Sequence, residues 1–215
     1  MGACCAGCSD GPGTVSVRYR RVLTLVLVIN AVMFAVEIAW SLIAGSTALQ
    51  ADALDFLADS LTYGLTLAVL GQPLAVRSRA ALLKGASLGG MALLVLGAAV
   101  WRGLGWSVPE PLTMSVVAAL ALAANLTSVL LLYRFRDGDA NMASVWQCSR
   151  NDAIGNLAVI AAAGAVTLTD SGWPDIAVAV AMAGLFLNSS IRIISRAWRE
   201  LDGARRGAAE LLGGL

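Results

Sequence analysis

The sequence contains six long apolar stretches separated by short polar connectors. The stretches cover approximately residues 22–44, 47–70, 80–100, 112–133, 142–168 and 176–194. Each has close to, or more than, the ~20 residues that an α-helix needs to cross the apolar core of a bilayer. The connectors are rich in Gly, Pro and Asp, which favour turns, and none is long enough to hold a second domain. The pattern therefore predicts six transmembrane helices.

The composition also indicates a membrane protein. Hydrophobic residues make up 58% of the 215 residues and charged residues 13%, and the mean hydropathy is +0.76. Soluble globular proteins carry roughly a quarter charged residues, so we expect the lipid bilayer to surround this chain. The expected fold class is an all-α integral membrane protein with no soluble domain. The net charge of +1 gives no electrostatic basis for binding nucleic acid.

The positions of the basic residues predict the orientation in the membrane, because cytoplasmic flanks carry an excess of Lys and Arg. An even number of spans places both termini on one side, which we expect to be the cytoplasm. We expect three parts: a flexible N-terminus with a cysteine cluster (1–21), a six-helix transmembrane transport domain (22–196) and a short basic tail (197–215). The outer side then holds only Arg102, and the inner side holds Arg18, Arg20, Arg21, Arg77, Arg79, Lys84, Arg134, Arg136, Arg192, Arg196, Arg199, Arg205 and Arg206.

Three aspartates lie within the second apolar stretch. A carboxylate at bilayer depth costs about 2.5–3.5 kcal/mol on insertion scales, so an apolar helix keeps several only where something offsets that cost. At 100° per residue, Asp52, Asp55 and Asp59 lie within about 60° of one another. They therefore form an acidic stripe on one face of the predicted helix.

The fifth stretch holds a matching pair, Cys148 and Asp152, again four residues apart on one face. Each pair comes about 12–18 Å after the start of its helix, and the two helices run in opposite directions, so Asp55 and Asp59 lie at the depth of Cys148 and Asp152. Four convergent ligands suit Zn²⁺, and three oxygens with one sulfur suit Zn²⁺ or Cd²⁺. Taken singly, an aspartate could bond a neighbouring helix and a cysteine could be a small buried residue, but helix packing does not require a matched depth.

Two other acidic residues have open roles. Asp52, one turn outward from Asp55, either helps ions to leave or caps or pairs near the interface. Glu37, in the first stretch, either carries protons or only balances the charge of Arg150. Asp52 and Glu37 are therefore candidates for an accessory site or a proton path.

Three of the four cysteines, Cys4, Cys5 and Cys8, lie in the polar N-terminus, and the chain has no histidine. These thiols could capture soft metal ions in the cytoplasm, form a redox pair or have no essential role. A CxxC motif without a strand and a helix behind it is weak support for redox chemistry. Metal capture is the interpretation that we favour.

The run from Gly45 to Asp59 resembles the second helix of the cation diffusion facilitator family, which are metal/proton antiporters of six helices. In that family the metal site pairs His or Asp with an Asp four residues later, once on the second helix and once on the fifth. The resemblance therefore implies a metal site at Asp55, Asp59, Cys148 and Asp152. Further similarities lie at Asn141-Met142, Gly155 and Trp173-Pro174-Asp175.

The sequence departs from the family pattern at two points. Cys148 stands where the family usually has His or Asp, which implies a softer metal selectivity. Family members also usually continue into a cytoplasmic metal-sensing domain that helps them to dimerise, so this chain resembles the truncated branch that lacks it. We therefore expect a homodimer formed through membrane helices, with Gly85 and Gly89 as a small-xxx-small contact.

Together these features predict a transporter, not an enzyme, with no prosthetic group. The expected function is export of a divalent transition-metal ion such as Zn²⁺ or Cd²⁺ by alternating access, in the inner (plasma) membrane of a bacterium. Four ionised ligands around a dication leave about two charges in excess, so metal ions and protons should compete and be exchanged. The alternatives are a membrane thiol oxidoreductase that uses the four cysteines, and a proton-coupled exporter of organic cations that uses Glu37 and the aspartates near Phe34 and Trp40.

Overall fold

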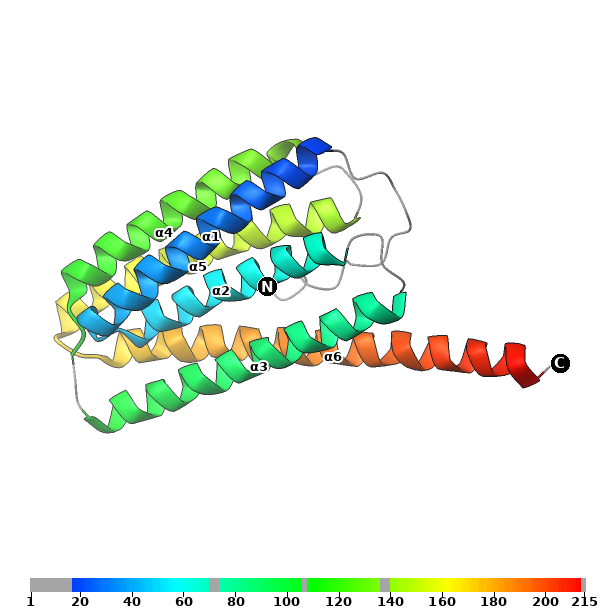
Figure 1. Ribbon diagram of the computed structural model, residues 1–215. Helices are drawn as coiled ribbons and strands as arrows, with labels where there is room; N and C mark the ends of the chain where they lie inside the picture. Colours follow the sequence, from blue (N-terminus) through cyan, green and yellow to red (C-terminus); the bar gives the residue numbers. More distant parts are fainter. Residues whose placement is uncertain (1–16, 70–73, 106–107, 136–139, 214–215) are drawn as a thin grey trace.

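A computed structural model describes residues 17–69, 74–105, 108–135 and 140–213, and Figure 1 shows these segments as an elongated bundle of helices. Within them there are six α-helices, one short 3₁₀ helix and no strand, so the predicted all-α fold with six helices is confirmed. The elements in chain order are α1 (Val17–Ala44), α2 (Thr47–Ala68), α3 (Leu74–Gly105), α4 (Pro111–Leu132), η1 (Tyr133–Phe135), α5 (Ala140–Thr169) and α6 (Trp173–Gly213).

Five of these helices are long and apolar enough to cross a membrane by length and composition. The other, α2, has 22 residues but carries the three aspartates of the acidic stripe. Large apolar side chains point outward from the bundle, with Leu94 68% exposed and Leu130 74% exposed. Apolar residues all round a helix are typical of membrane spans. The chain is therefore an integral membrane protein that crosses the bilayer several times.

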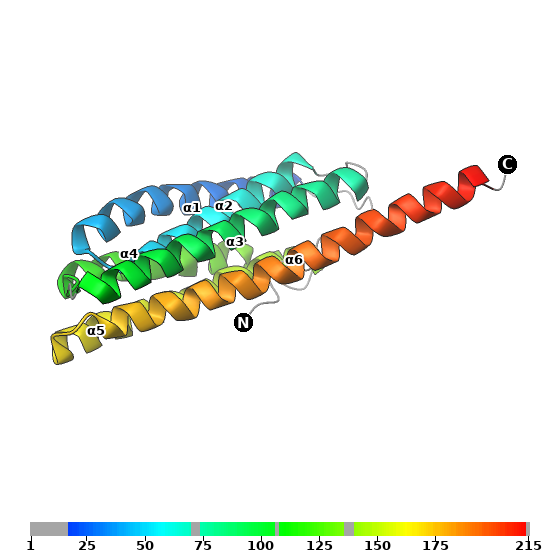
Figure 2. The same cartoon turned by 90° about the horizontal axis from the view of Figure 1, so that it is seen from below.

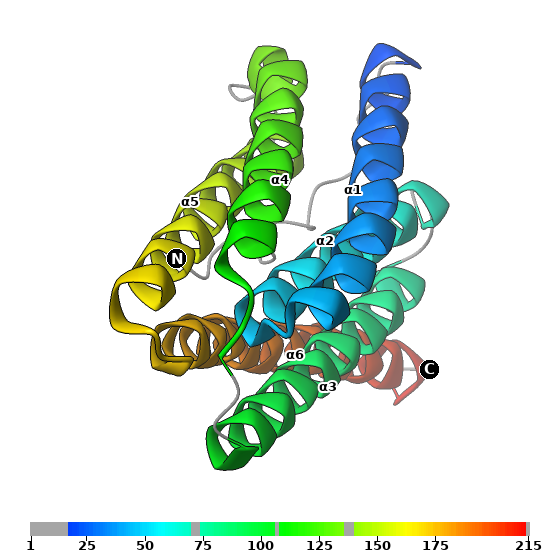
Figure 3. The ribbon, with the colours of Figure 1, turned by 90° about the vertical axis from the view of Figure 1, so that its left-hand side faces the viewer.

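Helix α2 lies at the centre of the bundle, because it contacts each of the other five α-helices. The bundle is otherwise built from neighbouring pairs, α1 with α2, α4 with α5, and α3 with α6, as the end-on view in Figure 3 shows. Small side chains allow this close approach, since Ala48, Ala118, Ala163 and Ala183 are all completely buried. The acidic stripe is thus carried by the helix with the most neighbours.

The beginning of α2 is fixed by a carboxylate from the beginning of α6. Asp175 is buried and accepts four hydrogen bonds, from Ser46 Oγ (2.5 Å), Thr47 Oγ1 (2.6 Å), Thr47 N (2.7 Å) and Ala48 N (3.1 Å). Ser46 is the N-cap, and its Oγ also accepts a hydrogen bond from Leu49 N (3.0 Å). A negative charge at a helix N-terminus is favourable, so this contact sets where α2 begins relative to α6.

Gly45 makes the sharp turn that precedes this cap. Its φ of +67° lies in the left-handed region that favours glycine, and the guanidinium of Arg102 from α3 donates a hydrogen bond to its carbonyl oxygen. Gly45 and Ser46, the first residues of the run that resembles the family's second helix, therefore have structural roles.

The contact between α3 and α6 corrects the prediction made for Gly85 and Gly89. Ser190 Oγ donates a hydrogen bond to the carbonyl oxygen of Gly85 (2.6 Å). A Cβ atom on Gly85 would lie 2.7 Å from Ile194 Cγ1, and one on Gly89 would lie 2.8 Å from Ser190 Oγ. The absence of a side chain at these two glycines therefore allows α6 of the same chain to pack closely against α3. Their assignment to a dimer contact is wrong. The homodimer itself stays a prediction.

Helix α6 also differs from its predicted length. The last apolar stretch ends near residue 194, but the helix continues to Gly213, through most of the segment that we expected to be a short basic tail (197–215). Figure 2 shows this part extending beyond the other helices. Hydropathy marks the part of a helix at lipid depth, whereas helical hydrogen bonds continue into polar sequence, so apolar stretches underestimate helix length.

Candidate functional site

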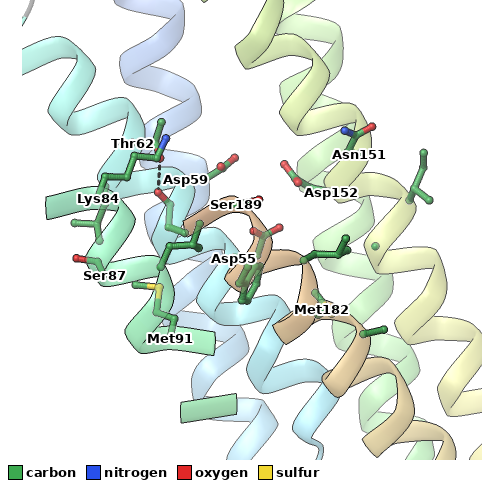
Figure 4. A pocket seen from close by; sticks show the side chains of 18 of the residues that line it. Asp55, Asp59, Thr62, Lys84, Ser87, Met91, Asn151, Asp152, Met182 and Ser189 are labelled. Atoms are coloured by element: carbon green, nitrogen blue, oxygen red, sulfur yellow. Dashed lines mark hydrogen bonds between the residues drawn. The ribbon is translucent and has the colours of Figure 1, made fainter. Parts of the chain in front are cut away.

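A cavity of about 290 Å³ lies among α2, α3, α5 and α6, and three carboxylates line it. Asp55 and Asp59 come from α2, and Asp152 comes from α5. Figure 4 shows Asp59 and Asp152 facing one another, with Asp55 between and below them. The structure thus brings together three of the four residues predicted to bind metal.

The fourth predicted ligand, Cys148, is part of α5 one turn before Asp152, but its side chain lies outside the described part of the structure. The cysteines predicted to capture metal, Cys4, Cys5 and Cys8, also lie outside the described residues. Among the residues that are described, no three Asp, Glu, His or Cys side chains converge closely enough to hold a metal ion as they stand. The three aspartates line one cavity, and their carboxylates would have to move closer together to bind the same ion.

A tyrosine orients one of the cavity carboxylates. Tyr63 Oη donates a short hydrogen bond to Asp59 Oδ2, and the Tyr63 side chain is 1% exposed. The two residues are four positions apart on α2, so they share a face of the helix. Sequence reasoning missed Tyr63, although this i, i+4 spacing from Asp59 could have indicated it.

One basic residue also lines the cavity. Lys84 of α3 was predicted only as part of the basic cytoplasmic flank, yet its side chain borders the same space as the three aspartates (Figure 4). Its role could not be read from the sequence, because only helix packing brings α3 beside α2. Lys84 places one positive charge at a site that otherwise carries negative charge. The remaining polar lining comes from Thr62, Ser87, Asn151 and Ser189.

The two accessory candidates lie elsewhere in the bundle. Asp52 and Glu37 are buried and do not line the cavity. Asp52 Oδ2 accepts a hydrogen bond from Asn156 Nδ2 (2.5 Å), and Asn156 Oδ1 accepts one from Asn125 Nδ2 (2.8 Å). The position of Asp52 therefore does not fit a capping role at the interface. Sequence reasoning missed Asn156.

Arg150 does not balance the charge of Glu37. Its side chain is exposed, and its guanidinium carbon lies 5.3 Å from the centre of the Trp146 ring. This is a cation–π contact within α5. The alternative role proposed for Glu37, as a counter-ion of Arg150, is therefore not supported.

A model of the cation efflux transmembrane domain matches residues 75–201, which is more than half of the chain. The chain belongs to the cation diffusion facilitator family. Members of this family transport metal cations across membranes and are not enzymes. A comparison with curated proteins found no match.

Family membership applies most directly to α3 through α6, and therefore to Asp152 and Lys84. Asp55 and Asp59 precede the matched region, so their place in this cation diffusion facilitator rests on the geometry of the cavity. The thiol oxidoreductase interpretation does not fit a family of transporters. Phe34 and Trp40, which the organic-cation interpretation needs near the site, do not line the cavity.

Proposed function

We propose that this protein exports divalent transition-metal ions, with Zn²⁺ and Cd²⁺ as the best candidates, in exchange for protons. The observation that carries the proposal is the cavity lined by Asp55, Asp59 and Asp152, because carboxylates at membrane depth are costly and typically mark an ion pathway. Cys148, one turn from Asp152 on α5, would supply the fourth ligand.

The charges of the cavity favour exchange with protons. Three carboxylates and one thiolate would carry four negative charges, and a dication neutralises two of them. The ammonium of Lys84, which borders the cavity, offsets one more. In the metal-free state the remaining charge is compensated by protons on the aspartates, so metal binding releases protons and protonation expels the metal.

The identity of Cys148 would set the metal preference. Thiolate is a softer ligand than the His or Asp usual at this position, and it favours Cd²⁺ and Zn²⁺ over hard ions such as Mg²⁺. We further propose that both termini face the cytoplasm of a bacterium, and that Cys4, Cys5 and Cys8 deliver metal from there. The ion would then move outward as the cavity opens to each side in turn.

Transport into sealed proteoliposomes tests this function. Purified protein is reconstituted, an acidic lumen is created, and Zn²⁺ or Cd²⁺ entry is followed with a dye trapped inside. We expect metal uptake that depends on the pH gradient and is lost in Asp55→Asn, with Asp170→Asn as a matched control at the exposed residue that follows α5.

Two outcomes would count against parts of the proposal. Metal uptake that does not depend on the pH gradient would contradict the proposed exchange with protons. Transport of a lipophilic cationic dye that depends on Asp55, without transport of metal, would favour the organic-cation interpretation instead.

A further inference from the structure

Glu37 is a carboxyl group buried in the second half of α1. The residue is completely buried, and neither Oε1 nor Oε2 meets a hydrogen-bond donor among the described residues. A buried carboxylate that no donor reaches is strongly unfavourable when ionised. The metal site proposed above does not use this group, so its retention in an apolar helix needs another explanation.

The carboxyl of Asp52 on α2 can explain it. Asp52 is 1% exposed, and its carboxyl acts on Glu37 both through its charge and as a hydrogen-bonding neighbour. Two carboxylates can form a hydrogen bond only when one of them carries a proton. The contact between Glu37 and Asp52 is therefore satisfied only when at least one of the two groups is protonated.

The neighbouring amides show which oxygen of Asp52 is already in use. Asn125 Nδ2 donates to Asn156 Oδ1, and this directs Asn156 Nδ2 toward Asp52 Oδ2. Asp52 Oδ2 is thus held as an acceptor by a chain of amides from α4 and α5. This arrangement favours Asp52 as the ionised partner and Glu37 as the partner that carries the proton.

The charged surroundings of the pair are simple. Helix α1 packs against α2 and α4. Helix α4 contains no charged residue, and α2 contributes Asp52, Asp59 and Asp55, whose charge acts on Glu37. Helix α5, which reaches Asp52 through Asn156, carries Arg150 and Asp152. Arg150 is exposed and lies over Trp146. A proton is therefore the cation that the described surroundings of the pair leave available.

We propose that Glu37 and Asp52 form a proton-binding site outside the metal cavity, which holds one proton while the cavity is metal-free and releases it when a dication binds. The coupling runs through Asp55, which lies one helical turn from Asp52 and acts electrostatically on Glu37. Positive charge placed at Asp55 favours ionisation of the pair, and a proton on the pair weakens metal binding by the same factor. This inference rests on the proposed function, since it assumes that the metal binds beside Asp55.

The test counts the protons released when metal binds. Purified protein in weakly buffered detergent solution is titrated with Zn²⁺ while a pH indicator reports proton release, and Zn²⁺ affinity is measured across a range of pH. We expect Glu37→Gln to bind Zn²⁺ with the wild-type number of ions but to release about one proton fewer per ion. Asp52→Asn removes the carboxyl that shares the proton with Glu37 and is expected to give the same loss. Asp170→Asn is the control, and it should release the wild-type number.

Infrared spectra give a second readout that does not depend on metal binding. The metal-free wild type should show C=O bands of protonated carboxylic acids, and Glu37→Gln should lose the component that arises from Glu37 in its apolar setting while the bands of the cavity aspartates remain. Wild-type proton release by both Glu37→Gln and Asp52→Asn would overturn the inference, and so would fewer bound Zn²⁺ ions in either variant, because the pair would then be a metal site. Failure of the proposed function has a different signature: Asp55→Asn would bind Zn²⁺ like wild type while the Glu37 component of the infrared bands persisted.

Discussion

The contact between Asp175 and the first turn of α2 allows a quantitative prediction. In Asp175→Ala, the main-chain N–H groups of Thr47 and Ala48 lose the acceptor that they have in a buried setting. Each unsatisfied group costs about 1–3 kcal/mol, which gives about 2–6 kcal/mol in total, whereas the hydroxyls can rotate toward other acceptors. In Asp175→Asn one acceptor oxygen remains, so we expect roughly half of that cost.

Thermal unfolding in detergent measures the difference. For a chain of this length, 1 kcal/mol corresponds to about 2–4 °C, so Asp175→Ala should lower the unfolding temperature by about 8–16 °C for the middle of the range. Asp175→Asn should fall between Asp175→Ala and wild type. Asp170→Asn makes the same chemical change at an exposed residue and should shift the temperature by less than about 2 °C. Unfolding of both Asp175 variants within 2 °C of wild type would refute the argument that α6 fixes the start of α2.

Three further predictions follow from the contacts of single residues. Gly85→Ala should destabilise the α3–α6 contact by about 1–3 kcal/mol, while Gly97→Ala, where a Cβ meets nothing within 4 Å, should be neutral or stabilising, as thermal unfolding would show. Hydrogen bonds from the Thr113 side chain and main chain lower the pKa of Glu110. Glu110→Ala should therefore reduce the free energy of unfolding most at neutral pH, and the reduction should disappear as the pH falls through that lowered pKa. Equal reductions at pH 7 and pH 3 would contradict this. Lys84→Gln should bind Zn²⁺ severalfold more tightly in calorimetry, because the ammonium no longer opposes the dication, and weaker binding would contradict this.

The sequence predicted the parts of the fold that depend on local pattern. Apolar stretches identify the six helices, and the spacing of Asp55 and Asp59 places both on the face of α2 that lines the cavity. Asp152 lies in the same cavity. Its depth could be predicted, because α2 and α5 run in opposite directions and the depth of a residue follows from its distance along the helix.

Features that depend on which helices become neighbours could not be predicted. Gly85 and Gly89 carry a pattern that suits close helix contact, but the pattern does not tell whether the partner is α6 or a second copy. Lys84 and Asn156 gain their roles only when α3 and α5 pack beside α2. The extent of α6 was missed because hydropathy reports lipid depth and not helical structure.

The central claim is that the cavity aspartates bind the transported ion, and calorimetric titration of purified protein with Zn²⁺ tests it most directly. Changing a group that only supports a metal ligand costs 10–100-fold in affinity, so loss of a ligand itself should cost at least about 100-fold. We predict that wild type and Asp170→Asn bind Zn²⁺ alike and that Asp152→Asn binds it at least about 100-fold more weakly. Equal affinity in Asp152→Asn and wild type would contradict the claim.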